Sequence, residues 1–259
     1  MQTSRRNFLK AAGLAALGFT VVKPALAIFS HSKPAEVALS EGPVTAHRFA
    51  MVVDTKACEE AGECTECIDA CHLTHNVPKM KDKDDEIKWI WKAPHEKVFP
   101  EEEYEFLEGD LKNRPVLVLC NHCTDPPCVK YCPTKATWKR EEDGIVMIDY
   151  HRCIGCRYCM AGCPYGARSF NWRNPRPFIE ELNPDFPTRS RGVVEKCNFC
   201  TERLVKGLLP ACVEACPQNA LTFGDLEDPD SKVREILRTK HFIRRLPELA
   251  TQPNVYYLE

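Results

Sequence analysis

Near its centre the chain reads Cys153-Ile-Gly-Cys156-Arg-Tyr-Cys159-Met-Ala-Gly-Cys163-Pro164. Two-residue gaps between the first three cysteines let one loop surround three corners of a small cubic metal cluster. The fourth cysteine follows three residues later, where a short helix points it the other way. The proline fixes φ and closes the loop. Because this is the C-x2-C-x2-C-x3-C-P spacing that holds [4Fe–4S] clusters, the run predicts an iron–sulfur site.

The same plan recurs three more times, and no cysteine is left over. All sixteen cysteines fall into groups of four, and every group ends in C-x3-C, which is an internal repeat. The groups are Cys58, Cys64, Cys67 and Cys71; Cys120, Cys123, Cys128 and Cys132; Cys153, Cys156, Cys159 and Cys163; and Cys197, Cys200, Cys212 and Cys216. Four thiolates are what one cluster requires, so the sequence predicts four [4Fe–4S] clusters and a protein that conducts single electrons.

Other uses of cysteine remain open at this point. Structural zinc also takes C-x2-C pairs, and an exported chain forms disulfides. Covalent haem needs C-x-x-C-H, and Cys67 to His72 is one residue too long for it. One degenerate site, giving three clusters or one [3Fe–4S] cluster, is the strongest rival, with the first group as the suspect because five residues separate Cys58 from Cys64.

Short apolar runs flank the cysteine groups and favour an α+β fold. Strands are expected at 50–53, 116–119, 145–148, 193–194 and 220–223, each beside a ligand loop and a one-turn helix. This order predicts two ferredoxin-like 2[4Fe–4S] modules built from four cysteine units, with loop insertions and little regular structure. The tail has helical spacing over 231–249, with Val233, Ile236, Leu237 and Ile243 on its apolar face, and ends in an extended stretch.

The expected organisation follows these groups. A signal peptide (1–27) and a linker (28–48) precede an outer module made of 49–78 and 193–227. An insertion (79–115) leads to the inner module (116–174), a proline-rich loop (175–192) and a C-terminal helix and tail (228–259). The charged runs of the insertion are expected to face solvent, and its Trp89 and Trp91 are candidates for packing on a partner.

The N-terminus has the features of a twin-arginine export signal. Arg5-Arg6 precedes an apolar run over 11–22 and an Ala25-Leu-Ala27 cleavage site. The run is shorter than the roughly 20 residues of a membrane-spanning helix. A periplasmic protein is therefore expected, and this route carries folded proteins, so clusters can be inserted before export.

Composition excludes several classes of function. Removing residues 1–27 deletes four basic residues and no acidic one, so the formal net charge falls from −2 to −6. Without a basic stripe, nucleic-acid binding is not expected. The mature chain has no apolar run that could span a bilayer, so membrane attachment would come through a partner. No nucleotide-binding motif and no spare cysteine is present, and a protein without its own catalytic site is expected.

From Met51 to Leu258 the chain resembles the four-cluster iron–sulfur subunits of the dimethyl-sulfoxide-reductase and polysulfide-reductase type. The motifs that carry the resemblance are Cys120-Asn-His-Cys123, Asp125-Pro-Pro-Cys128, Cys163-Pro-Tyr-Gly-Ala-Arg168, Lys196-Cys-Asn-Phe-Cys200 and Pro210-Ala-Cys212. With its export signal, the run from Cys64 to Pro78 is similar to the periplasmic subunit of the Dsr membrane complex of sulfur-metabolising prokaryotes and of the archaeal Hme complex.

This resemblance implies partners and a function. They are an NrfD-like, quinone-interacting membrane subunit and a multihaem cytochrome c, in a membrane complex of dissimilatory sulfur metabolism. The alternative is the β-subunit of a periplasmic molybdopterin oxidoreductase for polysulfide, thiosulfate, tetrathionate or a nitrite-related substrate. The same four clusters would carry electrons in either complex.

The resemblance also implies how the cysteines are shared, with fourth ligands exchanged within each module. Cluster I would take Cys58, Cys64, Cys67 and Cys216; cluster II would take Cys71, Cys197, Cys200 and Cys212; cluster III would take Cys120, Cys123, Cys128 and Cys163; and cluster IV would take Cys132, Cys153, Cys156 and Cys159. Cations beside a cluster are expected to raise its potential, and Arg157 and Lys196 adjoin cysteines.

Overall fold

A computed structural model describes residues 42–100 and 112–259. The expected export signal, most of the linker and the Glu101–Glu103 run lie outside these residues. The described part mixes short helices with small sheets, in keeping with the expected α+β class.

The largest sheet joins the two ends of the described chain. Its strand order is β8-β1-β10-β9, formed by β1 (Phe49–Asp54), β8 (Leu221–Asp225), β9 (Phe242–Ile243) and β10 (Val255–Leu258). Strand β10 runs parallel to β1, with Met51 opposite Val255, and β8 runs antiparallel to β1 on its other side. The central strand is therefore completed by residues about 200 positions further along the chain.

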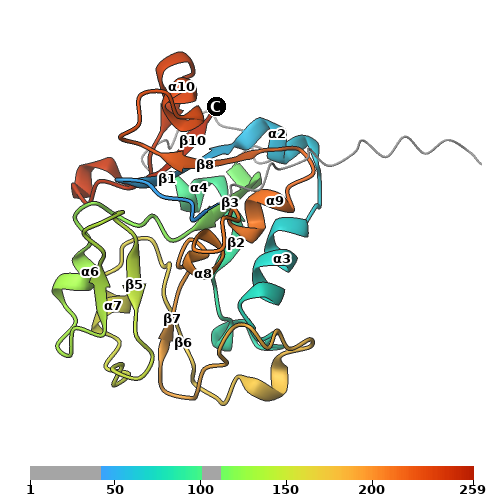
Figure 1. The fold of residues 1–259 in the computed structure, drawn as a ribbon. Coiled ribbons are helices and arrows are strands. Elements are labelled where there is room, and N and C mark those ends of the chain that lie inside the picture. The colour runs from blue at the N-terminus through green and yellow to red at the C-terminus, as the bar shows by residue number, and fades with distance from the viewer. Residues whose placement is uncertain (1–41, 101–111) are drawn as a thin grey trace, which may run out of the picture. The chain divides into compact units, whose positions relative to one another are not determined.

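Both faces of this sheet are buried, which explains why its central strands are apolar without interruption. Along β1, Phe49, Met51 and Val53 face the main core, where several cysteines also lie. Ala50 and Val52 face the opposite side, which helix α10 (Lys232–Thr239) covers through Val233. Figure 1 shows α10 above the sheet and the cysteine-bearing helices α3, α6, α7 and α9 below it.

Three two-stranded sheets and several short helices make up the rest. The sheets pair β2 (Ile90–Pro94) with β3 (Pro115–Leu119), β4 (Thr137–Lys139) with β5 (Val146–Ile148), and β6 (Ser169–Phe170) with β7 (Val194–Glu195). The helices are α2 (Thr55–Glu60), α3 (Glu66–Thr74), η2 (Lys83–Asp85), α4 (His95–Val98), α6 (Pro127–Lys130), α7 (Tyr158–Ala161), η4 (Arg176–Phe178), α8 (Thr201–Leu204), α9 (Ala211–Glu214) and η5 (Pro247–Leu249).

Local sequence sets the ends of several elements. The Asp54 carboxylate accepts from the Ala57 N–H and caps α2, and the Ser231 hydroxyl accepts from the Arg234 N–H and caps α10. Helix α10 stops at Thr239, so the expectation of a longer helix is wrong, and Ile243 lies on β9 instead. Val233, Ile236 and Leu237 do form the packed face, as expected.

The segment between the first two cysteine groups contributes to the core. Strand β2 pairs along its full length with β3, which leads into the second group. Trp89 is fully buried and stacks on His75 with ring centroids 4.3 Å apart. The expectation that Trp89 packs on a partner is therefore wrong, because its ring fills the centre of this chain's own fold.

Candidate metal centres

The C-x3-C ends of the four groups lie at short helices, and these helices meet in two pairs. Helix α3 carries Cys67 and Cys71 and contacts α9, while α6 contacts α7. The first group therefore meets the fourth, and the second meets the third. All sixteen cysteines lie in the described part of the chain, and none forms a disulfide.

Two small cavities in the second pair are each surrounded by four cysteines. The first follows the end of β3 and is lined by Cys120, Cys123 and Cys128 of one group and Cys163 of the next. The other is lined by Cys153, Cys156 and Cys159, with Cys132 from the preceding group. Each cavity thus receives three cysteines from one loop and one from its partner loop.

In the first pair, thiols of the two groups also lie near one another. Burial raises the pKa of Cys67 to about 12, and its charged neighbours Cys216, Cys58 and Cys64 add to the effect. Burial also raises the pKa of Cys71 well above its usual range, with Cys200, Cys197 and Cys212 adding to it. Cys58, which the sequence left as the least certain ligand, lies near Cys216 and Cys64. Burial raises its pKa, and these two cysteines raise it further.

Tight loops bring the cysteine pairs together. In three groups the residue before the second cysteine has a left-handed backbone: His122 (φ 42°), Gly155 (φ 69°) and Phe199 (φ 55°). This turn aims successive backbone N–H groups at the sulfurs, as when Phe199 N lies 3.4 Å from Cys197 Sγ. At Gly155 a side chain is excluded, because a Cβ there would lie 2.3 Å from the carbonyl oxygen of Gly192.

Buried polar atoms around the first cavity fit an iron–sulfur cluster. Among the described residues, the side-chain amide of Asn121 and the Nη1 of Arg168 are buried without a hydrogen-bond partner, although both residues line that cavity. A buried donor without an acceptor costs about 1–3 kcal/mol. The sulfides of a bound cluster would accept hydrogen bonds from these two donors, so the four thiols and the two donors fit an iron–sulfur cluster.

The most deeply buried thiols would stay protonated in the absence of a metal. Burial raises the pKa of Cys123 and Cys197 to about 12, and neighbouring cysteines add to the effect in both sites. A bound metal supplies the positive charge that converts such thiols to thiolates, so cluster insertion releases protons. These sites favour a charged metal group over free cysteine nucleophiles.

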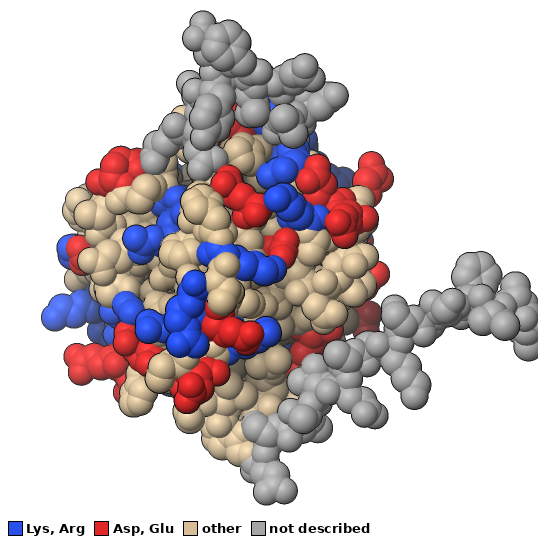
Figure 2. All heavy atoms as spheres, turned by 90° about the horizontal axis from the view of Figure 1, so that it is seen from above, with Lys and Arg blue, Asp and Glu red and all other residues tan. Residues whose placement is uncertain are grey.

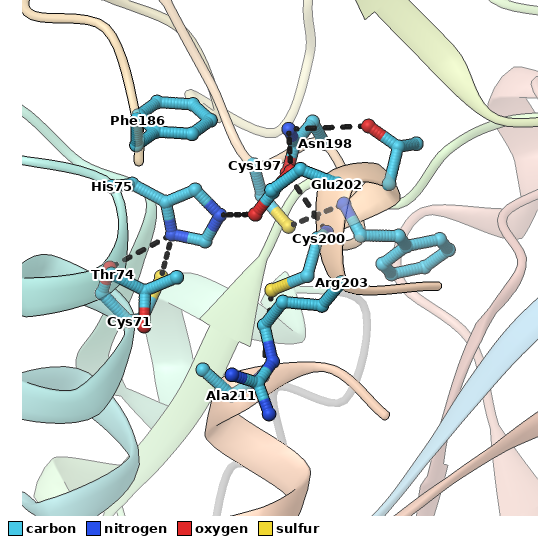
Figure 3. Close-up of polar contacts among 12 residues, drawn as sticks. Cys71, Thr74, His75, Phe186, Cys197, Asn198, Cys200, Glu202, Arg203 and Ala211 are labelled. Carbon is cyan, nitrogen blue, oxygen red and sulfur yellow. Dashed lines mark hydrogen bonds and ion pairs between the residues drawn. The ribbon is translucent and has the colours of Figure 1, made fainter. Parts of the chain in front are cut away.

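His75 links the second cluster position to a carboxylate (Figure 3). Its Nδ1 lies 2.8 Å from the Cys71 carbonyl oxygen and 3.6 Å from Cys71 Sγ, and its Nε2 lies 2.9 Å from the Glu202 carboxylate. His122 accepts a hydrogen bond from Val146 N at its Nδ1 and stacks on Phe199 at 3.7 Å. Histidines therefore hold the loops in place, and the His122–Phe199 stack joins the second and fourth groups.

The two asparagines that follow Cys120 and Cys197 are site residues that sequence reasoning passed over. Asn121 faces the first cavity, while Asn198 accepts from Cys200 N at 2.8 Å and donates to Glu202 at 3.0 Å. The repeated Cys-Asn-x-Cys pattern was the signal that could have found both. Arg168 ends the Cys163-Pro-Tyr-Gly-Ala-Arg168 motif, but its contact partner Cys128 lies 40 residues earlier, so the sequence did not show that contact.

Charges of both signs are mixed over one face of the molecule. Acidic and basic side chains are interspersed over the face in Figure 2, and no stripe of a single sign crosses it. Every helix in 42–100 and 112–259 falls short of the length and apolarity needed to cross a membrane.

Two family models, both described as a 4Fe-4S dicluster domain, match residues 116–176 and 152–221. The first match contains the second and third cysteine groups, and the other contains the third and fourth. Together with the sixteen cysteines, these matches confirm the predicted iron–sulfur cofactors.

Several proteins are similar over nearly the whole chain. The Hdr-like menaquinol oxidoreductase iron-sulfur subunit 1 of Archaeoglobus fulgidus is 39% identical over 281 residues, covering 98% of this chain and 97% of the relative. The menaquinone reductase iron-sulfur cluster-binding subunit of Nitratidesulfovibrio vulgaris is 40% identical, covering 82% and 88%. A tetrathionate reductase subunit of Salmonella typhimurium is 35% identical, covering 100% and 89%.

Proposed function

The chain belongs to the family of iron–sulfur electron-transfer subunits of the dimethyl-sulfoxide-reductase and polysulfide-reductase type, and we propose that it is the electron-transfer subunit of a quinone-linked membrane complex. Electrons pass through four [4Fe–4S] clusters between a menaquinone-reactive partner and a second redox subunit. The observation that carries the proposal is the full-length similarity to a menaquinol oxidoreductase subunit. The chain conducts electrons and contributes no catalytic site of its own.

The ligand sets follow the exchange of fourth cysteines. We assign Cys58, Cys64, Cys67 and Cys216 to cluster I; Cys71, Cys197, Cys200 and Cys212 to cluster II; Cys120, Cys123, Cys128 and Cys163 to cluster III; and Cys132, Cys153, Cys156 and Cys159 to cluster IV. The two four-cysteine cavities and the shared electrostatic neighbourhoods of the other eight thiols support this assignment. The two ferredoxin-like modules would then be 116–174 and the pair 49–78 with 193–227.

Replacing Gly155 by alanine is expected to remove cluster IV alone. The new Cβ meets the Gly192 backbone, so the loop that carries Cys153 and Cys156 has to move. Purified under nitrogen, Gly155→Ala should hold about 12 iron atoms per chain where the parent chain holds about 16.

Gly166→Ala is the matched control for this variant. Gly166 has a similar left-handed backbone, φ 63°, but an added Cβ meets nothing within 4 Å. This control should keep its full iron content. Full iron content in both variants would count against cluster IV being held by this loop.

The partners we propose are an NrfD-like membrane subunit and a multihaem cytochrome c. The names of the Archaeoglobus and Nitratidesulfovibrio relatives, with menaquinol and menaquinone chemistry, support the quinone link. The Arg5-Arg6 signal supports export by the twin-arginine route, with cleavage after Ala27 and a periplasmic location beside the membrane. Dissimilatory sulfur metabolism is the proposed context.

A second function has its own support. The tetrathionate reductase relative of Salmonella and an arsenate respiratory reductase iron-sulfur relative of Shewanella also match over most or all of this chain. The chain would then be the β-subunit of a complex with a large molybdopterin subunit, and the same four clusters would carry electrons to it.

Purification from native membranes through a C-terminal tag decides between the two. Recovery of a multihaem cytochrome c and an NrfD-like protein, together with cluster bleaching when a menaquinol analogue is added, is expected. Recovery of a large molybdopterin subunit instead would contradict the main proposal and establish the second.

A further inference from the structure

Arg168 is buried between two of the cysteine-lined cavities. Only 4% of the residue is exposed, and its Nη2 donates to Cys128 Sγ at 3.1 Å and to Thr137 Oγ1 at 2.8 Å. Its charge also attracts Cys159, which lines the neighbouring cavity. Burial disfavours its charged form, but the thiolates of Cys128, Cys159 and Cys120 outweigh this and raise the pKa of Arg168. The residue is therefore a permanent cation shared by two metal positions.

Lys196 is a second buried cation near the first cavity, because it donates to the carbonyl oxygen of Val146, which lines that cavity. It is fully buried, and its Nζ donates to the carbonyl oxygens of Val146 and Cys197, the second at 2.5 Å. Burial lowers its pKa, while Cys120, Cys197 and Cys128 oppose that shift, so the charge lies near cysteines of two different sites. A nitrogen that donates to two carbonyl oxygens has the donor geometry of an ammonium group.

Two cations beside other cluster positions are less enclosed. Arg157, beside the last cluster position, is exposed and stacks on Trp172 at 4.6 Å. Lys92, near the first position, is half-buried and donates to the Gly62 carbonyl oxygen in an exposed contact. Water screens such charges strongly, whereas a charge enclosed by protein acts at several times the strength.

The effect of an enclosed cation on a cluster has a fixed sign. Reduction adds one electron and one negative charge, and no bond is made or broken. A nearby positive charge stabilises the reduced form more than the oxidised form, so it raises the midpoint potential. Two such cations, Arg168 and Lys196, lie near the site made of Cys120, Cys123, Cys128 and Cys163.

We propose that the buried charges of Arg168 and Lys196 make cluster III the cluster of highest potential among the four. Arg168 is shared with cluster IV and Lys196 with cluster II, so each cation tunes two clusters. This inference rests on the ligand assignment proposed above. A transferred electron would then be held on cluster III, inside the chain.

The test is an EPR-monitored redox titration of the intact protein and two variants. Arg168→Met should move two of the four components to more negative potential, and Lys196→Met should also move two. One component should move in both variants, and in the parent chain this component should have the highest potential. Lys232→Met is the control, because this exposed lysine pairs with Glu235 on α10, away from the cysteine groups, and its loss should leave all four potentials unchanged.

Further variants separate folding from tuning. Arg168→Lys keeps the charge, so its potentials should lie close to those of the parent chain. Lys196→Gln also removes a charge, and its titration gives a second measurement if one of the methionine variants loses iron. Four components that do not move, or a shared component of low potential, would overturn the inference. Fewer than four components in the parent chain would instead contradict the ligand assignment.

Discussion

Removal of the clusters should abolish the cooperative unfolding transition of this protein. Cysteines from all four groups lie in or against its main core, among them Cys67, Cys71, Cys120 and Cys212. Without the clusters, the space between the sixteen thiols would be unfilled, and the core would lose the packing that the clusters provide. Structural metal sites contribute about 10–16 kcal/mol each in small zinc domains, as much as the whole stability of a typical domain of about 5–15 kcal/mol.

Near-ultraviolet circular dichroism during anaerobic chelation with an oxidant measures this effect. The aromatic signal should disappear in step with the iron, because Trp89, Phe199 and Phe223 lie in the same core. Reconstitution with iron and sulfide should restore it. A chain that keeps a sharp urea transition after losing all its iron would show that the β8-β1-β10-β9 sheet folds by itself.

Arg189→Met should cost about 3–5 kcal/mol, because it leaves a buried carboxylate without its cation. The side chains of Arg189 and Glu195 are fully buried, and their charged atoms lie 2.6 Å apart. Glu195 also accepts from Trp89 Nε1 at 3.0 Å and from Asn171 Nδ2 at 2.6 Å. Arg189 in turn donates to the carbonyl oxygens of His75 and Asn76, which ties the proline-rich loop to α3.

The double variant Arg189→Met, Glu195→Gln is the control for this prediction. It removes both charges, so it should recover a large part of the loss. Anaerobic urea unfolding, followed by circular dichroism with iron content measured in parallel, gives the comparison. Equal midpoints for the parent and Arg189→Met would contradict the prediction.

Local spacing accounts for what the sequence could predict. The short strands before each cysteine group, such as β3 before Cys120 and β5 before Cys153, follow from four-residue apolar runs beside turn residues. The cysteine groups follow from gaps of two and three residues. Both signals act within about ten residues, where backbone geometry is nearly independent of the rest of the fold.

Contacts between distant segments account for what it missed. The helical spacing of apolar residues predicted that Ile243 lies on a helix. The helix does not continue beyond Lys240, because Phe242 and Ile243 pair with β10. Trp89 reads as a candidate surface residue until Glu195, 106 positions later, accepts its indole proton. Arg189 is an ordinary polar residue in the sequence, and Arg168 and Asn121 stand there only as members of cysteine motifs. Their contacts with a carboxylate, a sulfur and a cavity form only in the assembled core.

The place of β10 in the large sheet has a consequence for biosynthesis. Strand β1 leaves the ribosome early, but its parallel neighbour follows about 200 residues later. The segment leading to β10 also supports the loop of the second cysteine group, since Asn254 donates to the His122 carbonyl oxygen and Gln252 accepts from Thr124 N. Contacts of such high sequence separation form late. A nascent chain therefore exposes one edge of β1 until residues 255–258 emerge, and this edge is where we expect chaperones to bind during translation.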